Sequence, residues 1–323
     1  MPKFDVVSVG NAKIDEFLSI HKATQHLRLN KDTNELCIKS GEKITVDKCD
    51  FLLGGNAANV AVGLSRLGLN SSICVEIGDD EFSQKIIKAL TEEKVNIDLL
   101  KQSNGQPSSF SVILNFQNER TIFSEHIRRA HNFTFDDIKT KWIYLTSIGN
   151  EWKNAYKNVT DYVLQSKCFL AFNPGTLQIE AGRESIVNVL SITNILFVNK
   201  EEAVEILNMK YEILNIKEVL IKLQKLGPKI VVITDGDNGS YAIDEKGQIF
   251  MHDIYKTRVV EKTGAGDAYS TGFLAAILHG LSIKDAMAWG ALNSASVIEK
   301  TGAQAGLLTR GEMQEGLKRI SNY

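Results

Sequence analysis

The sequence predicts an α/β protein with a mainly parallel, doubly wound sheet and a small additional β-sheet. Three observations carry this prediction. Short β-branched runs alternate with helix-like runs through the middle of the chain, which is the βαβ rhythm of a parallel sheet. Polar or glycine-containing turns follow several of these runs, where such sheets bind ligands. Two other stretches, about 16–52 and 108–126, show the short alternating pattern of antiparallel strands.

The composition is that of an ordinary globular chain. Its 323 residues, 43% hydrophobic and 24% charged, are enough for one core domain spanning 1–323 with a small insertion. A formal net charge of -2, with both signs interspersed, gives no basis for binding nucleic acid or an anionic membrane. The four cysteines are isolated, and no leader-like or membrane-spanning run occurs. We therefore expect reduced thiols and a cytoplasmic protein.

The first predicted strand runs from Phe4 to Gly10 and is a β-branched run that ends in glycine. Asp15 follows about five residues later, near the crevice at the carboxyl ends of the parallel strands. Asp15 is therefore a candidate substrate ligand. The alternative is a solvated loop residue.

The two alternating stretches are expected to pair as one sheet outside the core. E-L-C-I-K and K-I-T-V-D lie in the first, and the second has two strand-like runs around the turn Q-N-E. Such a sheet would be a lid, formed by about 16–52 and 108–126, that excludes water from the crevice. Two ordinary edge hairpins are the alternative.

A glycine pair opens the helix predicted between the two stretches. Gly54 and Gly55 would let a ligand approach the backbone, and Asn56 and Asn59 follow in the first turns. Asparagine offers both a donor and an acceptor, which suits a polyhydroxylated ligand. Helix capping would explain one asparagine but less easily two.

The remaining core alternates regularly. Strand-like runs are expected near 72–77, 142–147, 169–173, 195–199 and 229–234, separated by helix-like runs near 81–93, 151–165, 179–190, 201–207 and 216–226.

Two strand ends in this region carry candidate ligands. Asn199 and Glu202 could organise a hydrated Mg²⁺, although an acid in a helix's first turn is also favoured by the helix dipole. Thr234 is followed by Gly236 and Gly239, which would let the backbone lie against a nucleotide.

The segment T-G-A-G-D, Thr263 to Asp267, is followed by an apolar helical run. Gly264, Ala265 and Gly266 would expose the N–H groups of a helix start to an anion. Asp267, in the same turn, is suited to accept a proton from a hydroxyl that attacks a phosphoryl group, which indicates a kinase. A simple helix cap is the alternative. The segment is neither a Walker loop nor a dinucleotide fingerprint.

Three segments then combine: G-G-N-A-A-N-V-A-V-G-L-S-R-L-G from Gly54, N-K-E-E from Asn199 and K-T-G-A-G-D-A-Y-S-T-G-F from Lys262. Together they resemble the ribokinase-like (PfkB) carbohydrate kinase family, over essentially the whole chain. The resemblance implies ATP-dependent phosphate transfer to a substrate hydroxyl, in a three-layer α/β/α core with a β-sheet lid.

The resemblance also implies roles for individual residues. Asp267 resembles the catalytic base, and the backbone of Gly264, Ala265 and Gly266 resembles the anion hole. The other positions match substrate, metal or nucleotide contacts of the family: Asp15 and Asn59 for substrate hydroxyls, Gly54 and Gly55 for substrate approach, Asn199 and Glu202 for Mg²⁺ and phosphate, Thr234, Gly236 and Gly239 for the nucleotide, and Asn293 for the border of the adenine.

Three positions depart from the family pattern. Glu261 stands where ribokinases carry aspartate six residues before the base, and Gly306 where they often have serine. Those positions belong to a potassium site that activates some members, so K⁺ activation is an open question here, with Glu261 as the candidate ligand. Asn56 replaces a lysine common in ribokinases and phosphosugar kinases.

The leading hypothesis is a cytoplasmic, ATP-dependent sugar kinase, with a possible homodimer formed through the lid. A nucleoside kinase is the near alternative, with lid aromatic side chains stacking on the base. The candidates are Phe110, Phe116, Phe123 and Phe133, which equally suit packing within the lid. A phosphosugar kinase would use Arg120, Arg128 and Arg129. A non-catalytic sugar- or nucleotide-binding regulator is the alternative of another class, and the intact T-G-A-G-D segment argues against it.

Overall fold

The computed structural model describes residues 3–22, 24–30, 32–33, 35–116, 119–125, 127–136, 138–209 and 215–321. Gln117 and Asn118 of the predicted Q-N-E turn, and residue 126 at the predicted lid boundary, lie outside these ranges.

One large sheet forms the core, with eight strands in the order β16-β15-β14-β13-β12-β11-β1-β6. From β14 to β6 neighbouring strands run parallel, and β15 and β16 add an antiparallel edge. The strands are β1 Phe4–Val9, β6 Ser71–Cys74, β11 Thr140–Leu145, β12 Phe169–Phe172, β13 Ile195–Asn199, β14 Ile230–Thr234, β15 Ser240–Ile243 and β16 Ile249–His252.

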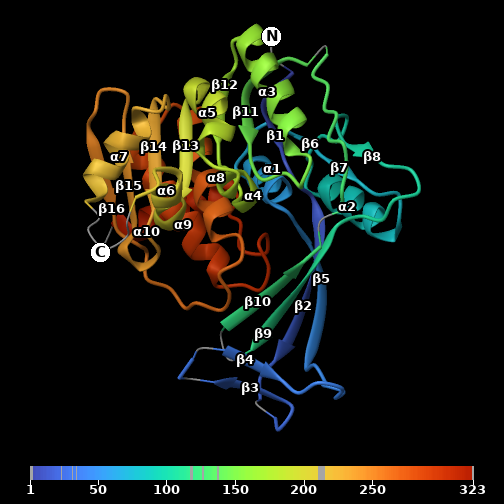
Figure 1. Ribbon diagram of the computed structural model, residues 1–323. Helices are drawn as coiled ribbons and strands as arrows, with labels where there is room; N and C mark the ends of the chain where they lie inside the picture. Colours follow the sequence, from blue (N-terminus) through green and yellow to red (C-terminus); the bar gives the residue numbers. More distant parts are fainter. Residues whose placement is uncertain are drawn as a thin grey trace.

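Helices cover both faces of this sheet, which gives three layers (Figure 1). The strands are apolar on both sides, so alternate residues pack in opposite directions: Val7 of β1 joins the core on one face and Val6 the core on the other. The first face packs on α3 Trp152–Ser166, α4 Thr176–Glu180, α5 Arg183–Ile192, α6 Lys200–Ile206 and α7 Ile216–Gln224. The second packs on α1 Asn56–Arg66, α8 Ala265–Leu278, α9 Ile283–Ile298 and α10 Arg310–Ser321.

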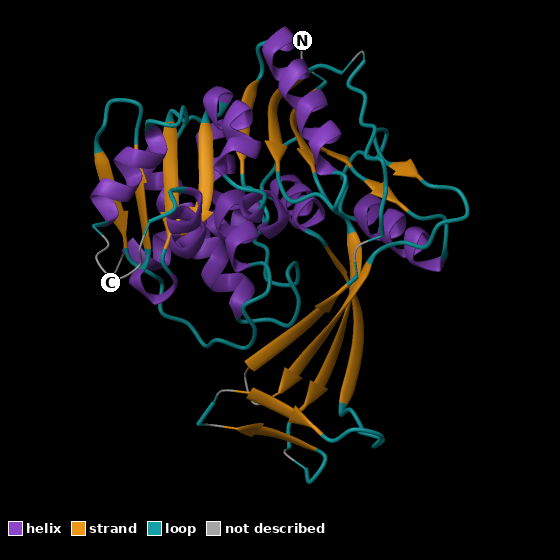
Figure 2. Cartoon of the chain, in the orientation of Figure 1, coloured by secondary structure: helices purple, strands orange, loops and turns teal. Residues whose placement is uncertain are grey.

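A second sheet, the lid sheet, extends away from the core (Figure 2). Its order is β10-β9-β2-β5, so the two alternating stretches of the sequence pair with each other as predicted. Its strands are β2 Lys13–Ile20, β5 Lys48–Gly54, β9 Phe110–Phe116 and β10 Glu119–Ser124. A hairpin of β3 Leu27–Asn30 and β4 Glu35–Ile38 packs on part of one face through a small apolar cluster.

Some element bounds differ from the sequence-based expectations. Asp15 lies inside β2 rather than in a loop after β1, because the lid sheet begins closer to the core than expected. The helix expected over 179–190 is two helices, since Gly182 adopts a φ of 85° between α4 and α5. The expected strand at 72–77 divides into β6 and β7 Glu76–Ile77; β7 pairs with β8 Lys101–Gln102. The K-I-T-V-D run forms no strand.

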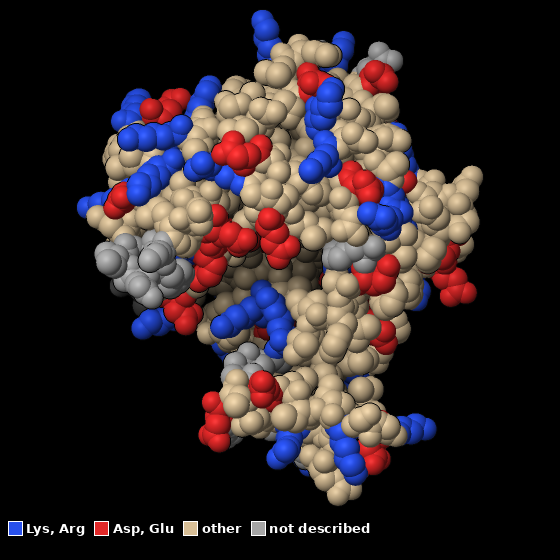
Figure 3. All heavy atoms as spheres, viewed as in Figure 1, with Lys and Arg blue, Asp and Glu red and all other residues tan. Residues whose placement is uncertain are grey.

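The remaining helix, α2 Glu81–Glu92, packs its apolar side against the β6 end of the core sheet. None of the helices in the described ranges combines the length and apolar content that a membrane crossing needs. Figure 3 shows a hollow between the core and the lid sheet, with acidic side chains along its core rim and basic side chains inside it.

Candidate active site

The loop before α8 is shaped by close packing. Gly264 has a φ of 78° and caps α8, and a Cβ atom there would lie 2.4 Å from the Cβ of Ala303. Both constraints require glycine. Ala265, Gly266 and Asp267 form the first turn of α8, with no atom within 4 Å of the position a Gly266 Cβ would take. The helix start is therefore open to an anion from that side.

The carboxylate of Asp267 is buried and held from two sides. Its Oδ1 accepts a hydrogen bond from Asn56 Nδ2 at 3.0 Å, and its Oδ2 accepts one from Asn59 Nδ2 at 2.8 Å. Burial raises the pKa of Asp267 to about 6, against the lowering effect of the two amide hydrogen bonds. A carboxylate with a pKa near neutral pH is suited to act as a general base. Asn56 and Asn59 thus orient the base, and Asn56 also lines the adjoining cavity.

Gln304 adds a further support that sequence reasoning missed. Its Nε2 donates to Asn59 Oδ1 at 2.9 Å, which directs the amide nitrogen of Asn59 toward Asp267. The available signal was its place in T-G-A-Q-A-G, the segment that packs beside the α8 loop.

Asp15 lies close to this base on β2. Its side chain is 5% exposed, and burial raises its pKa. The buried Oδ1 has no hydrogen-bond partner among the described residues. A buried polar atom without a partner is costly unless a ligand completes it. A substrate hydroxyl would do so.

The glycine pair is packed closely against neighbouring groups of the chain. A Cβ on Gly54 would lie 1.9 Å from Asp15 Oδ2, so Gly54 makes room for that carboxyl group. Gly55 has a φ of 94°, and its Cβ would lie 2.5 Å from the carbonyl oxygen of Asn11. The fold itself therefore requires glycine at both positions.

Asn199 and Glu202 form a reciprocal cap at the start of α6. Glu202 N donates to Asn199 Oδ1, and Asn199 N donates to Glu202 Oε2, both at 2.8 Å. Burial raises the pKa of Glu202 to about 7, and the Asp267 charge adds to this rise. The carboxylates of Glu202 and Asp267 line one cavity of about 310 Å³, together with Thr234, Lys262 and the α8 start.

This cavity suits a magnesium ion that arrives with a nucleotide. In the part of the chain that the structure describes, no three His, Cys, Asp or Glu side chains group to hold a metal. Mg²⁺ commonly uses one or two carboxylates, with water and phosphate oxygens as its other ligands. Glu202, which lines this cavity together with the α8 start, would fit that ligand set.

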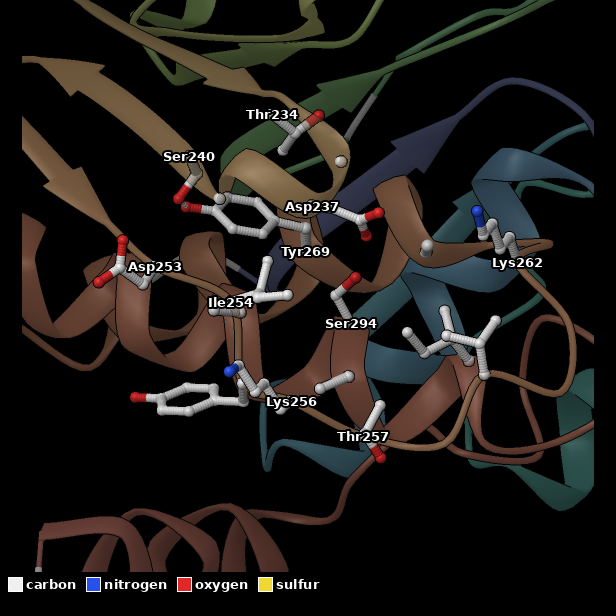
Figure 4. Close-up of a pocket in the computed structure, with 18 of the residues that line it drawn as sticks. Thr234, Asp237, Ser240, Asp253, Ile254, Lys256, Thr257, Lys262, Tyr269 and Ser294 are labelled. Carbon is white, nitrogen blue, oxygen red and sulfur yellow. Dashed lines mark hydrogen bonds between the residues drawn. The ribbon is translucent and has the colours of Figure 1, made fainter. Parts of the chain in front are cut away.

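A second cavity, of about 480 Å³, adjoins the first at the α8 start (Figure 4). Thr234, Lys262 and Tyr269 line both cavities, with Gly236 and Gly239 at the wall of the second. In Figure 4, Tyr269 and Ser240 lie near one another, and Tyr269 Oη donates to Ser240 Oγ at 2.8 Å. The remaining wall of the second cavity comes from the loop 253–259 and from α9. Sequence reasoning missed the loop because it carries no motif.

Asn293 requires a correction. It was expected to border the adenine, but it is fully buried and its neighbours Ala291 and Ser294 line the cavity instead. Its Nδ2 donates to the carbonyl of Ala268 at 2.8 Å, and its Oδ1 accepts from Leu308 N at 3.0 Å. Its amide joins α9 to α8 and to the following loop. This use was hidden from sequence reasoning because both partners are backbone groups.

Glu261 also differs from expectation. Its carboxylate accepts from Arg120 Nη1 at 3.0 Å, from Thr263 N at 2.6 Å and from Gly302 N at 3.3 Å. A guanidinium cation already occupies the carboxylate, so these residues do not fit a potassium ion. Gly306 packs against the backbone of Ser296, where a Cβ would lie 2.2 Å from the carbonyl oxygen.

The three arginines considered for a substrate phosphate do not form a group. Arg128 pairs with Glu151 at the surface, whereas Arg129 is buried and donates to Ser109 Oγ and the carbonyl of Pro107. Arg120 alone lines the cavity that holds Asp267.

The aromatic residues considered for stacking on a base also differ in exposure. Phe116 and Phe133 are buried, whereas Phe110 and Phe123 are at least partly exposed. The first two are therefore unavailable to a ligand.

The chain matches the pfkB family of carbohydrate kinases over residues 18–310. It is 27% identical to a nucleoside kinase of Methanocaldococcus jannaschii over 82% of this chain and 85% of that protein. It is 25% identical to a 5-dehydro-2-deoxygluconokinase of Bacillus thuringiensis, over 81% of this chain and 84% of that protein. The ribokinase of Arabidopsis thaliana, solved with ribose and ATP, shares the fold at a TM-score of 0.79 and 20% identity, over 98% and 99% of the two chains.

Proposed function

Because the chain belongs to the pfkB family of carbohydrate kinases, we propose that it transfers the γ-phosphate of ATP to a hydroxyl group of a small sugar. One observation carries this proposal. A buried carboxylate, Asp267, stands at an anion-binding helix start and beside the unpartnered carboxyl oxygen of Asp15. That arrangement suits a hydroxyl nucleophile and a phosphoryl group in one place.

In this proposal, Asp15 and Asn59 hold hydroxyl groups of the sugar, and the reacting hydroxyl gives its proton to Asp267. The N–H groups at the start of α8, from Gly264 to Gly266, face the phosphoryl oxygens that carry the developing charge. Glu202 would hold Mg²⁺ through water, and the bound ion would neutralise part of the phosphate charge. The lid sheet would exclude bulk water from the reacting groups.

The nucleotide would lie in the cavity of about 480 Å³ that adjoins the α8 start. Asn199, Thr234, Gly236 and Gly239 are the proposed contacts, because they lie at the ends of β13 and β14 beside the shared wall of the two cavities. Asn293 is excluded from this set by its burial. ATP as the donor also supports a cytoplasmic location, where free thiols such as the four cysteines here are stable.

A nucleoside acceptor is the second candidate, favoured by the nucleoside kinase that is 27% identical to this chain. A panel of acceptors separates the two candidates. Sugars, sugar acids, sugar phosphates and nucleosides are each offered with Mg²⁺ and either ATP or ADP, and consumption of the nucleotide by the enzyme is measured for each acceptor. Turnover confined to nucleosides would replace the sugar proposal. Absence of turnover in protein that binds ATP would support the non-catalytic regulator.

The Asp267→Asn variant tests the proposed base. We expect turnover to fall by roughly 10²- to 10⁴-fold, because general base catalysis typically contributes that much. ATP binding, measured by calorimetry, should change little. Asp161→Asn is the matched control, since Asp161 pairs with Lys157 on the surface of α3. Near-normal turnover of Asp267→Asn would refute the assignment.

We also propose that two chains associate through their lid sheets. On the face of the lid sheet away from Asp15, Phe51 and Phe123 are 47% and 54% exposed. They stand on the outer strands β5 and β10, and large apolar side chains exposed on one face of a sheet favour a protein interface. Gel filtration with light scattering should give twice the chain mass, and Phe51→Ser with Phe123→Ser should give the chain mass. A wild-type monomer at high concentration would refute this proposal.

A further inference from the structure

Arg120 joins the lid sheet to the loop that precedes α8. Its Nη1 donates to Glu261 Oε1 at 3.0 Å and to Thr263 Oγ1 at 2.7 Å. Arg120 lies on β10, whereas both acceptors lie about 140 residues later, immediately before the anion-binding turn. The contact is therefore a direct link from the lid to the catalytic loop.

Glu261 is the centre of this link. Its side chain is only 4% exposed, and its two oxygens also accept the N–H groups of Thr263 and Gly302. The carboxylate thus ties the α8 loop to the neighbouring segment around Gly302. A buried carboxylate that loses its cation is left with an uncompensated charge, which would loosen this arrangement.

The register of the lid sheet directs Arg120 toward the core. Arg120 stands opposite Asn115, and Ser124, four residues along β10, stands opposite Ser111. Ser111 is in turn opposite Asp15 on β2. Because residues opposite one another share a face, and alternate residues return to it, Arg120 and Asp15 project from the same face. Arg120 can reach Glu261 only while this face rests on the core.

We propose that Arg120 is a positioning residue that supplies the cation at Glu261 and so couples seating of the lid to ordering of the anion-binding loop. The inference rests on the proposed kinase function and adds that seating of the lid controls this activity. It also bears on potassium: the guanidinium already supplies a positive charge at Glu261 Oε1, the candidate cation ligand. The kinase should then need no added K⁺.

Arg120 also lines the cavity of Asp267, so a direct contact with phosphate is the competing explanation. The two explanations differ in how Arg120 depends on Glu261. If Arg120 acts through Glu261, removing both should lose no more activity than removing one. If it acts directly on phosphate, the two losses should multiply.

Hydrogen exchange of the Arg120→Gln protein is the primary test, because it does not require turnover. We expect faster exchange at the amides of Thr263 and Gly302 than in wild type, with unchanged exchange in α3. Arg128→Gln is the matched control, since Arg128 forms a surface ion pair with Glu151. Unchanged exchange at both amides in Arg120→Gln would overturn the proposal, whatever substrate the enzyme uses.

Kinetics of Arg120→Gln, Glu261→Gln and the double variant form the second test, in the wild-type reaction found with the acceptor panel. We expect a roughly 10- to 100-fold loss of kcat in each single variant, as for a small misplacement of catalytic groups, and no further loss in the double variant. Millimolar guanidinium should restore part of the activity of Arg120→Gln. Thr263→Val, which removes the other Arg120 contact, covers the case in which Glu261→Gln fails to fold.

Replacing K⁺ by Na⁺ at constant ionic strength completes the test. Wild-type kcat should change by less than about twofold, since the Arg120 guanidinium, rather than a monovalent ion from solution, supplies the cation at Glu261. A strong requirement for K⁺, or multiplicative losses in the double variant, would overturn the proposal. Failure of every acceptor to react would instead count against the kinase function, while the exchange result would still decide the coupling.

Discussion

Asp267 shows how a short side chain acquires a function from its surroundings. The residue is an aspartate in the first turn of a helix, a place where aspartate is common for helix stability alone. Its surroundings change this role: the two amide donors fix both oxygens, and burial raises the pKa to about 6 against the lowering effect of those hydrogen bonds. The same carboxylate at an exposed helix start would be a weaker base at a less defined position.

The pH dependence of kcat/KM follows from this raised pKa. Asp267 must be deprotonated to accept a proton, so activity should fall as the pH drops through about 6, the raised pKa of Asp267. Asn56→Ala should move the acid limb to higher pH, because it removes a hydrogen bond that lowers the pKa of Asp267. A profile that stays level down to pH 5 would contradict the assignment. The measurement is a series of initial rates at constant ionic strength.

Among the structural elements, the junction of β2 and β5 positions the substrate side of the site. Asp15 on β2 lies against Gly54 at the end of β5, and α1 begins two residues later with Asn56. The strand end and helix start thereby place two polar side chains, those of Asp15 and Asn56, close to Asp267. Their placement depends on the absence of a side chain at Gly54.

Gly54→Ala should therefore damage acceptor binding selectively. The added Cβ would lie 1.9 Å from Asp15 Oδ2, so the carboxyl group must move. We expect kcat/KM for the acceptor to fall roughly 10- to 100-fold, as for other misplacements of about 1 Å, with the KM for ATP little changed. Gly311→Ala is the control, since nothing lies within 4 Å of its Cβ position on α10. Equal losses for acceptor and ATP would indicate general misfolding instead.

Over the whole molecule, one arginine joins three distant segments. Arg66 at the end of α1 donates Nε and Nη2 to Glu93 after α2, and Nη1 to the carbonyls of Gln304 and Leu307. The Gln304 side chain in turn orients Asn59. The arrangement connects global stability to the position of the catalytic base.

Arg66→Met should lower the free energy of unfolding by about 2 kcal/mol at pH 7, less than for a fully buried pair because both side chains are about a quarter exposed. The hydrogen bond from Arg66 lowers the pKa of Glu93, so the pair stabilises the fold above the unfolded-state pKa and loses this effect as the pH falls through the lower folded-state pKa. Urea unfolding at pH 7 and pH 3 should show a smaller difference between the proteins at the lower pH. Arg319→Met, at a surface pair on α10, should change stability by less than about 0.5 kcal/mol.

The sequence by itself determined the features that depend on local rules. β-branched runs and their spacing predicted the parallel core, and alternating runs predicted the lid sheet, because strand and helix periods are written in neighbouring residues. Likewise, Gly264 and Asp267 were recognisable at a helix start from glycine conformation and helix-end chemistry. The family resemblance rested on the same short segments.

Only the tertiary structure decided which side chains meet across the chain. Asn59 and Asp267 are 208 residues apart, and Arg120 and Glu261 are 141 apart, so no local period relates them. For the same reason, Asn293 was expected at the nucleotide but joins backbone groups in the core, and Glu261 was expected at a cation site but binds an arginine. Such contacts depend on how whole elements pack, because packing selects the one partner that removes an unpaired charge or donor from the interior.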